Sequence, residues 1–385
     1  MMNRIFRTPL RMLYAGTVFF AFQTAITAYI NSTAIGNHLR DSDVGIIYSS
    51  SALLTLFGLY LLPHILKKYG NFKTSLSLIT ISLVSLVAIS SIRHTSILLF
   101  FVIYLVTNTL ISYCLDIFVE HYSKTESTGQ TRGMYLTLIN AAWVCAPFVS
   151  GLLATHNIYS IYVLAGLTTL PLAGVLIAKF SHFKDVQYDH IAFRKTFTRL
   201  LNSKNLRNIF ASNFLLNFFY SWMVVFSPIY LHDVLGISWS LIGILFTVML
   251  LPFVLFEYPL GKIADKKAGE KELLIAGFVV MSSATLLFSY SGTMTLAMIA
   301  LILFLTRTGA SMVEIMSETY FFKKVDESDS EMISIFRYTS PLAYLVGPLT
   351  ATIVLQLFSY QTLFTLLSII MLSGIYFSYA IKDTK

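Results

Sequence analysis

The chain has 385 residues, of which 56% are hydrophobic and only 12% are charged. Soluble domains carry about 25% charged residues, so this composition excludes an ordinary soluble enzyme or binding domain and indicates a polytopic membrane protein. The formal net charge is +8, from 27 Lys and Arg against 19 Asp and Glu. We attribute this excess to membrane topology, and we expect the lipid bilayer, not nucleic acid, as its partner.

Long apolar stretches follow one another along the chain, and each approaches the roughly 20 residues that a helix needs to cross a bilayer. Two pairs of stretches have no charge between them and are divided by turn residues at Ser291 and Gly292 and at 359–361. The expected fold class is therefore an all-α membrane protein with twelve transmembrane helices. In chain order these helices are predicted at residues 12–36, 44–63, 74–92, 95–120, 133–155, 158–178, 208–231, 236–260, 273–291, 294–318, 335–357 and 361–381.

One long hydrophilic segment, residues 181–207, interrupts the series after the sixth helix. Its apolar residues, Phe193 and Phe197 among them, alternate with basic ones at helical spacing, which predicts an amphipathic helix on the cytoplasmic membrane surface. We expect this segment to connect two six-helix bundles, formed by residues 1–180 and 208–385.

Lys and Arg are concentrated in alternate loops, as expected if those loops face the cytoplasm. With the N-terminus inside, the basic residues at 63–73, in the connector and at 261–271 are all cytoplasmic, and only Arg40 and Arg93 fall outside. We therefore predict cytoplasmic termini and a multi-pass protein integral to the cell membrane, plasma or inner. The first apolar run is too long for a cleaved signal peptide and is expected to stay as an anchor.

The two halves repeat each other at a nearly constant offset. Gly45 and Gly243 are 198 positions apart, and Pro147 and Pro348 are 201 positions apart. Similar offsets across several helices indicate duplication. Two parallel repeats of six helices are an organisation found in secondary transporters, in which the substrate site lies between the halves near the membrane midplane.

Residues 261–271, with the sequence GKIADKKAGEK, closely resemble the cytoplasmic loop signature G-x-L-A-D-R-x-G-R-K of the major facilitator superfamily, with one inserted residue. The first-half counterpart, residues 63–73, keeps the glycine but has Lys67 where the family has Asp. The resemblance implies a cytoplasmic latch between the bundles, with Asp265 as its functional acid. The alternative is that these charges only set topology. The latch residues expected are Gly70, Gly261, Asp265, Lys266 and Gly269.

The fifth helix carries the sequence AWVCAPFVSG at 142–151, and the eleventh repeats it as AYLVGPLTA at 343–351. Both resemble the G-x-x-x-G-P-x-x-G-G pattern of antiporters in the same superfamily. Small residues let helices approach closely, and proline permits a bend. We expect helix bends at Pro147, Gly151, Gly347 and Pro348; helix packing alone would also explain the pattern.

Charges within the predicted helices are costly in lipid and therefore mark functional positions. Arg307 lies near the middle of the tenth helix, and its repeat mate in the fourth is Asn108. Asp116 and Glu314 lie deep in the same two helices. A carboxyl there can bind a proton in one transport state and release it in another, so we interpret Asp116, Glu314 and Arg307 as proton-coupling groups. A purely structural pair between Arg307 and either acid is the alternative.

Four further charges lie nearer the predicted cytoplasmic ends. We expect Glu120 and Glu318 to form a gating network with Arg132 and Arg337, as charges at these positions do across the superfamily. The alternative is that they are ordinary solvated helix ends.

Polar and aromatic residues at helix midpoints predict a cavity suited to a lipophilic or amphipathic ligand, although interhelical packing explains each of them singly. The candidates are Gln23, Thr24, Asn108, Asn140, Trp143, Asn217, Tyr220 and Trp222.

The sequence contains no recognisable catalytic, nucleotide-binding or metal-binding motif. We therefore expect no enzyme activity, no metal and no cofactor, with the proton as coupling ion and a small molecule as substrate. The preferred prediction is a functional monomer that exports a lipophilic solute by proton antiport, its two bundles rocking around a central site. The alternatives are symport or uniport of an anionic metabolite bound by Arg307, and a non-transporting membrane receptor or assembly protein with the same fold.

Overall fold

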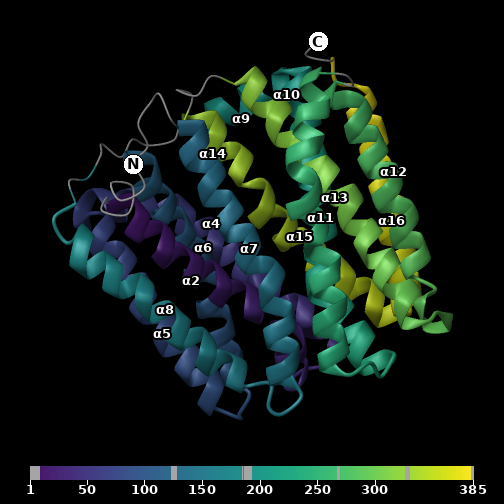
Figure 1. Cartoon of the computed structure of the whole chain (residues 1–385), viewed down its shortest axis with the longest axis horizontal. Helices are drawn as coiled ribbons and strands as arrows, with labels where there is room; N and C mark the ends of the chain where they lie inside the picture. Colours follow the sequence, from purple (N-terminus) through teal and green to yellow (C-terminus); the bar gives the residue numbers. More distant parts are fainter. Residues whose placement is uncertain are drawn as a thin grey trace. The chain divides into compact units, whose positions relative to one another are not determined.

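The computed structural model describes residues 9–122, 128–183, 185, 193–266, 269–325 and 330–382. The regular secondary structure in these ranges is helical, and they contain no strand (Figure 1). Ten of its helices are long and apolar enough to cross a membrane, and a shorter apolar helix covers Leu138–Ala154. The protein is thus an all-α, multi-pass membrane protein, as its apolar stretches predict.

The chain divides into two compact units. The first comprises residues 1–190 together with 238–244, and the second comprises residues 191–237 and 245–385. The first unit contains α2 (Pro9–Ala28), α3 (Asn31–Gly36), the short 3₁₀ turn η1 (Asp41–Asp43), α4 (Val44–Tyr69), α5 (Asn71–Ser91), α6 (Ile97–Tyr122), α7 (Thr128–Ala154) and α8 (Ser160–Phe180).

The second unit begins with the amphipathic part of the connector, which forms α9 (Phe193–Asn202). Its next helix, α10 (Lys204–Ile229), ends in a π-helical turn, η3 (Tyr230–Val234). The helices that follow are α11 (Trp239–Lys266), whose first turns belong to the first unit, α12 (Glu270–Phe288), α13 (Leu296–Lys324), α14 (Ser330–Arg337), α15 (Thr339–Leu357) and α16 (Tyr360–Tyr379), with the 3₁₀ turn η4 (Ser291–Thr293) between α12 and α13.

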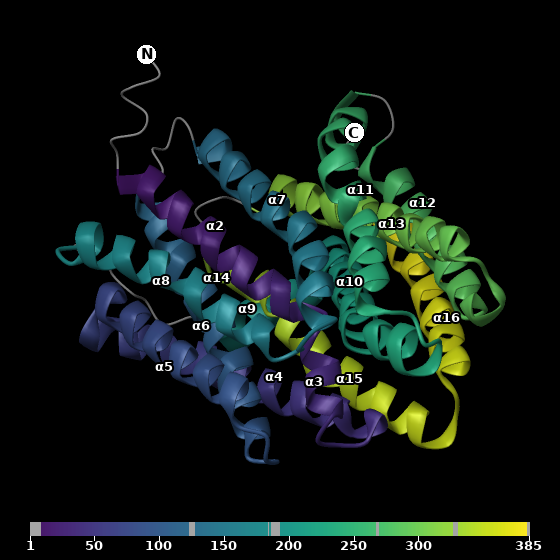
Figure 2. The same ribbon diagram turned by 60° about the horizontal axis from the view of Figure 1, so that its bottom comes forward.

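Each unit buries one face of its helices and exposes another. In the first unit, α5, α6 and α8 lie side by side (Figures 1 and 2), and Phe118 packs against Phe180 with ring centroids 5.0 Å apart. On the outer face of α8, by contrast, Val163 and Leu167 are 52% and 58% exposed. Because hydrocarbon is as apolar as these side chains, such faces are suited to contact with lipid.

The second unit is organised in the same way. Its helices α12, α13 and α16 lie side by side, and the serines at 282 and 368 form mutual hydrogen bonds between α12 and α16. Tyr230 of the π-helical turn packs edge-on against Phe288, at 5.8 Å between ring centroids, and in a tilted arrangement against Phe364, at 5.3 Å. These contacts hold the end of α10 against α12 and α16.

Candidate functional site

Arg307 lies at the centre of the most informative group of side chains. It sits twelve residues into the 29-residue helix α13, and its side chain is only 1% exposed. Helix α10 packs beside α13 and brings two aromatic rings to the guanidinium. The guanidinium carbon lies 5.2 Å from the ring centroid of Phe219 and 5.1 Å from that of Tyr220. Both distances are within the range of a cation–π interaction.

Tyr220 also links Arg307 to Glu314. Its hydroxyl donates a hydrogen bond of 2.5 Å to Oε2 of Glu314, while its ring lies against the guanidinium. Arg307 and Glu314 are seven residues apart, close to two helical turns, so both lie on the face of α13 that α10 covers. We call Phe219, Tyr220, Arg307 and Glu314 the α10–α13 cluster.

Among the residues that the structure describes, the Nε, Nη1 and Nη2 atoms of Arg307 are buried and have no hydrogen-bond partner. Burying an ion costs several kcal/mol, whereas each aromatic face returns about 1–2 kcal/mol. The two rings therefore compensate the guanidinium only in part. An anionic group that accepts its N–H bonds would complete the arrangement.

Asp116 and Asn108, the first-half candidates, lie on α6 in the first unit. Asp116 is half-buried, and Asn108 is 8% exposed with its Oδ1 atom buried and lacking a hydrogen-bond partner within the described ranges. Of the two acids that the sequence proposes for proton coupling, Glu314 is the one that shares a unit and a bridging tyrosine with Arg307.

The first-unit cavity candidates on α2 are engaged in a hydrogen-bond network. Gln23 is fully buried, and its Nε2 donates to the hydroxyl of Tyr104 at 2.6 Å. Thr27 shares the same hydroxyl at 2.6 Å, and Thr24 donates to the Phe20 carbonyl at 3.1 Å. The sequence reasoning missed Tyr104. Its place one turn before Asn108, on an otherwise apolar helix, is the signal that could have identified it.

The remaining cavity candidates lie on α7 and α10. Asn140 and Trp143 are half-buried on α7, and the amide of Asn217 donates to the Asn213 carbonyl at 2.9 Å. Trp222 is 1% exposed, and its Nε1 donates to the Gly347 carbonyl at 2.6 Å. Trp222 therefore joins α10 to α15 beside the proline of the repeated motif.

The helix-bend candidates lie inside continuous helices. Pro147 and Pro348 fall within α7 and α15, and both are buried. A Cβ atom built on Gly151 would lie only 2.8 Å from the Cα of Gly243, which belongs to the same unit. The small residue at 151 thus permits a close approach of two backbones.

The predicted cytoplasmic gate is described in part. The side chains of Glu120, Arg132, Asp265 and Lys266, together with Gly261, lie outside the described part of the structure. Glu318 is exposed, Arg337 is half-buried and Gly269 is buried directly before α12.

Gly70 forms a turn that an unexpected acid completes. Its φ angle is +79°, a conformation that favours glycine, and it joins α4 to α5. The backbone N–H of Asn71 donates to Oδ1 of Asp185 at 2.7 Å, so an acid from the connector caps the start of α5. Sequence reasoning missed Asp185, because nothing local indicates a partner so distant along the chain.

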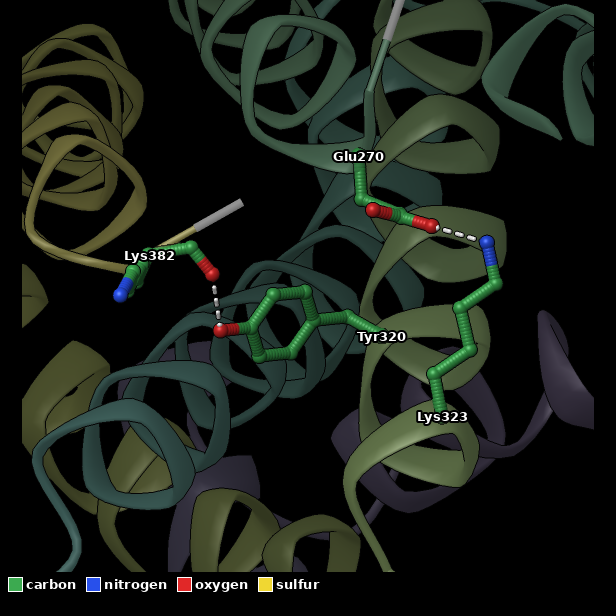
Figure 3. A network of polar contacts seen from close by, with 4 residues as sticks. All are labelled: Glu270, Tyr320, Lys323 and Lys382. Atoms are coloured by element: carbon green, nitrogen blue, oxygen red, sulfur yellow. Dashed lines mark hydrogen bonds and ion pairs between the residues drawn. The ribbon is translucent and has the colours of Figure 1, made fainter. Parts of the chain in front are cut away.

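A second polar network joins the start of α12 to the end of α13 in the second unit (Figure 3). Lys323, in the last turn of α13, donates to Oε1 of Glu270, in the first turn of α12, at 2.5 Å. The hydroxyl of Tyr320 donates to the Lys382 carbonyl at 2.6 Å. Glu270 was also missed by the sequence reasoning; an acid opening one helix and a base closing its neighbour were the available signal.

Within the described ranges, no group of three or more His, Cys, Asp or Glu side chains is arranged to hold a metal ion.

Comparison with known proteins yields one family and a set of similar folds. The family model described as Major Facilitator Superfamily matches residues 13–327 and 209–385. The crystal structure of a mutant of the nucleoside transporter NupG has a TM-score of 0.79 at 13% identity, covering 97% of this chain and 100% of that chain. The crystal structure of an auto-inhibited POT family peptide transporter has a TM-score of 0.79 at 12% identity, covering 98% of each chain. These likenesses concern the fold alone. No curated protein sequence matches the chain.

Proposed function

The chain belongs to the major facilitator superfamily, a family of secondary transporters, and from this premise we propose that it moves a small molecule across the cell membrane by proton-coupled alternating access. The observation that carries the proposal is the hydrogen bond from Tyr220 to Glu314 beside the buried Arg307. A carboxyl group, a cation and a tyrosine between spanning helices form a group whose charge one proton changes.

In this proposal Glu314 takes up and releases the proton. When Glu314 is ionised, the Tyr220 hydroxyl donates to it, as observed. When Glu314 is protonated, its O–H can donate and the tyrosine oxygen can accept, so the contact persists in both states. The net charge of the cluster changes from zero to +1 on protonation. Such a change biases the populations of two conformations that hold the charge in different surroundings.

We propose export of a lipophilic solute by proton antiport as the first candidate function. The small-residue and proline patterns of α7 and α15 support it, and the aromatic residues of α10 suit a lipophilic cargo. Asp116 is the second proton candidate, the working unit is a monomer, and both termini are cytoplasmic.

A second candidate is symport of an organic anion with a proton. The specific observation in its favour is that the guanidinium nitrogens of Arg307 are buried and lack hydrogen-bond partners among the described residues. An anion that entered with a proton would supply the missing acceptor.

Antiport and symport can be distinguished in proteoliposomes that contain a pH-sensitive dye. Lipophilic cations, neutral compounds and organic anions are added outside. Antiport makes the lumen alkaline, because entering substrate is exchanged for protons, and symport acidifies it. We expect Glu314→Gln to reduce the substrate-dependent pH change at least about tenfold. Glu272→Gln, which alters an exposed carboxylate in the first turn of α12, is the control.

A pH change that survives in Glu314→Gln but disappears in Asp116→Asn would place coupling in the first unit and contradict the role of Glu314. No pH change with any compound of the panel would contradict proton coupling.

A further inference from the structure

The unused donors of Arg307 call for a partner that the described chain does not supply. Most buried polar groups in proteins have at least one hydrogen-bond partner, and guanidinium groups that serve only structure are paired. Arg307 instead has three buried nitrogens without an acceptor in the described residues, and two aromatic rings lie against its guanidinium. Neither ring can accept the N–H bonds as a carboxylate does.

We propose that Arg307 is the anion-binding residue of this transporter and that its cargo is a lipophilic organic monoanion, of which an aromatic carboxylate is the simplest form. This inference rests on the proton-coupled transport proposed above. It favours the second candidate, symport of an organic anion with a proton, over antiport. The planar guanidinium fork matches the two oxygens of a carboxylate, which a single point charge would not distinguish from other anions.

The surroundings of Arg307 determine the character of the cargo. Phe219 is 0% exposed, and its ring centroid lies 5.2 Å from the guanidinium carbon, so Arg307 has an apolar aromatic neighbour on the side of α10. Such a neighbour favours a hydrophobic body and disfavours a strongly hydrated one. Within the described cluster Arg307 is the one cation, so a second negative charge on the cargo would lack a counter-charge.

Glu314 then links the cargo to the proton. In the empty cluster an ionised Glu314 offsets the charge of Arg307, through the bridging Tyr220. When an anion binds Arg307, a proton on Glu314 removes the second negative charge. The cluster is therefore neutral both when empty and when loaded with one anion and one proton. Proton and anion bind cooperatively, and this is the condition for symport.

The test measures binding to the purified protein in nanodiscs by calorimetry, without a gradient. The probes are benzoate, 2-naphthoate and indole-3-acetate, each compared with its neutral amide and with the corresponding primary ammonium compound. We expect at least one carboxylate to bind about tenfold or more tightly than its amide, and more tightly at pH 6 than at pH 8. Arg307→Gln should lower carboxylate affinity by about tenfold to a hundredfold and leave amide affinity unchanged. Arg307→Lys should retain part of the affinity.

Thermal unfolding of the ligand-free variants separates binding from structure. Because removing Arg307 alone would leave Glu314 without its counter-charge, the comparison is made in the Glu314→Gln background. There Arg307→Met removes a buried cation and should unfold at the same or a higher temperature than Glu314→Gln alone, whereas a structural arginine predicts the opposite. The proposal is overturned if the double variant unfolds several degrees lower than Glu314→Gln, if no carboxylate of the panel binds, or if Arg307→Gln binds carboxylates as tightly as the original protein.

The two proposals fail in different ways. Proton flux that depends on Glu314 but occurs only with cations or neutral compounds overturns the anion site and leaves proton coupling intact. Carboxylate binding that depends on Arg307, in a protein whose transport ignores the Glu314→Gln change, supports the site and overturns coupling at Glu314.

Discussion

His38 lies in the turn between α3 and η1, in a small group of aromatic and basic side chains. Its Nε2 atom is 3.2 Å from the hydroxyl of Tyr159, and the guanidinium carbon of Arg93 lies 3.8 Å from the centroid of the same tyrosine ring. Burial lowers the pKa of His38 below its ordinary value of 6.5, and the positive charges of Arg93 and His94 lower it further. The folded protein therefore disfavours protonation of this side chain.

This shift predicts the sign of a pH effect on stability. Below pH 6.5 the unfolded chain binds a proton at His38 more readily than the folded one does, so stability falls as the pH drops through this range toward the lowered pKa of His38. His38→Gln should reduce the loss of unfolding temperature between pH 7.5 and pH 5. The exposed His156 provides the control, and His156→Gln should leave the loss unchanged. Equal losses in the two variants would refute the assignment.

At the scale of single residues, the sequence predicts which residues are functional candidates better than it predicts which residues they contact. Arg307 and Glu314 can be selected from the sequence because a charge within an apolar stretch is conspicuous. The double role of Tyr220 could not be predicted, because it depends on which helix lies beside α13. Trp222 shows the same limit: its indole hydrogen bond to Gly347 depends on how α10 and α15 pack.

At the scale of elements, α12 and α13 approach each other closely through two glycines. A Cβ atom built on Gly309 would lie 2.5 Å from the nitrogen of Met281 and 2.6 Å from the carbonyl oxygen of Gly277. Both atoms belong to the backbone, so neither can move aside without shifting a helix. The close packing of α13, which carries Arg307, against α12 therefore depends on the absence of a side chain at Gly309.

We expect Gly309→Ala to destabilise the protein by about 1–3 kcal/mol, because overpacking forces the helices apart. Gly174→Ala on α8 is a suitable control, since a Cβ there would meet nothing within 4 Å. Its higher helix propensity should make that variant equally stable or more stable, by up to about 1 kcal/mol. Thermal unfolding of both in one detergent gives the comparison, and a Gly309→Ala variant as stable as Gly174→Ala would show that the contact is unimportant.

Each predicted helix overlaps an observed one, and the differences in where helices begin and end have identifiable causes. The sequence predicts an end at residue 63, where proline occurs, but α4 continues to Tyr69 and stops at the left-handed Gly70. A proline inside an apolar helix removes one hydrogen bond without ending the helix. The first predicted helix, 12–36, is instead α2 followed by the short α3. Apolar composition runs through that break without a glycine or proline to mark it.

At the scale of the whole molecule, the distribution of Lys and Arg predicts the membrane orientation, and this prediction can be tested directly. In a variant whose Cys114 and Cys145 are replaced by Ser, we introduce one cysteine as Thr95→Cys or as Lys204→Cys, both at exposed positions. A membrane-impermeant maleimide should label the first in intact cells and the second only after permeabilisation. The reverse pattern would invert the predicted topology.

The order and approximate positions of the apolar helices could be predicted from the sequence, because each helix is set locally by some 20 residues of apolar chain. The polar contacts at the helix ends could not be predicted, because the two partners of each contact are distant in sequence. Asp185 caps α5 from 114 residues away, and Glu270 meets Lys323 from 53 residues away. Pairs of this kind require knowledge of which helix ends meet.

The connector is attached at two points whose spacing along the chain is known. Asp185 is bound to the start of α5 in the first unit, and Thr196 of α9 donates to Glu331 of α14 in the second. Thr196 follows Asp185 by eleven positions, a length of chain that can extend to about 40 Å at most. While both contacts hold, the backbone between them limits how far Asp185 and Thr196 can separate. We expect that breaking either contact would permit a larger separation and leave the α10–α13 cluster unchanged.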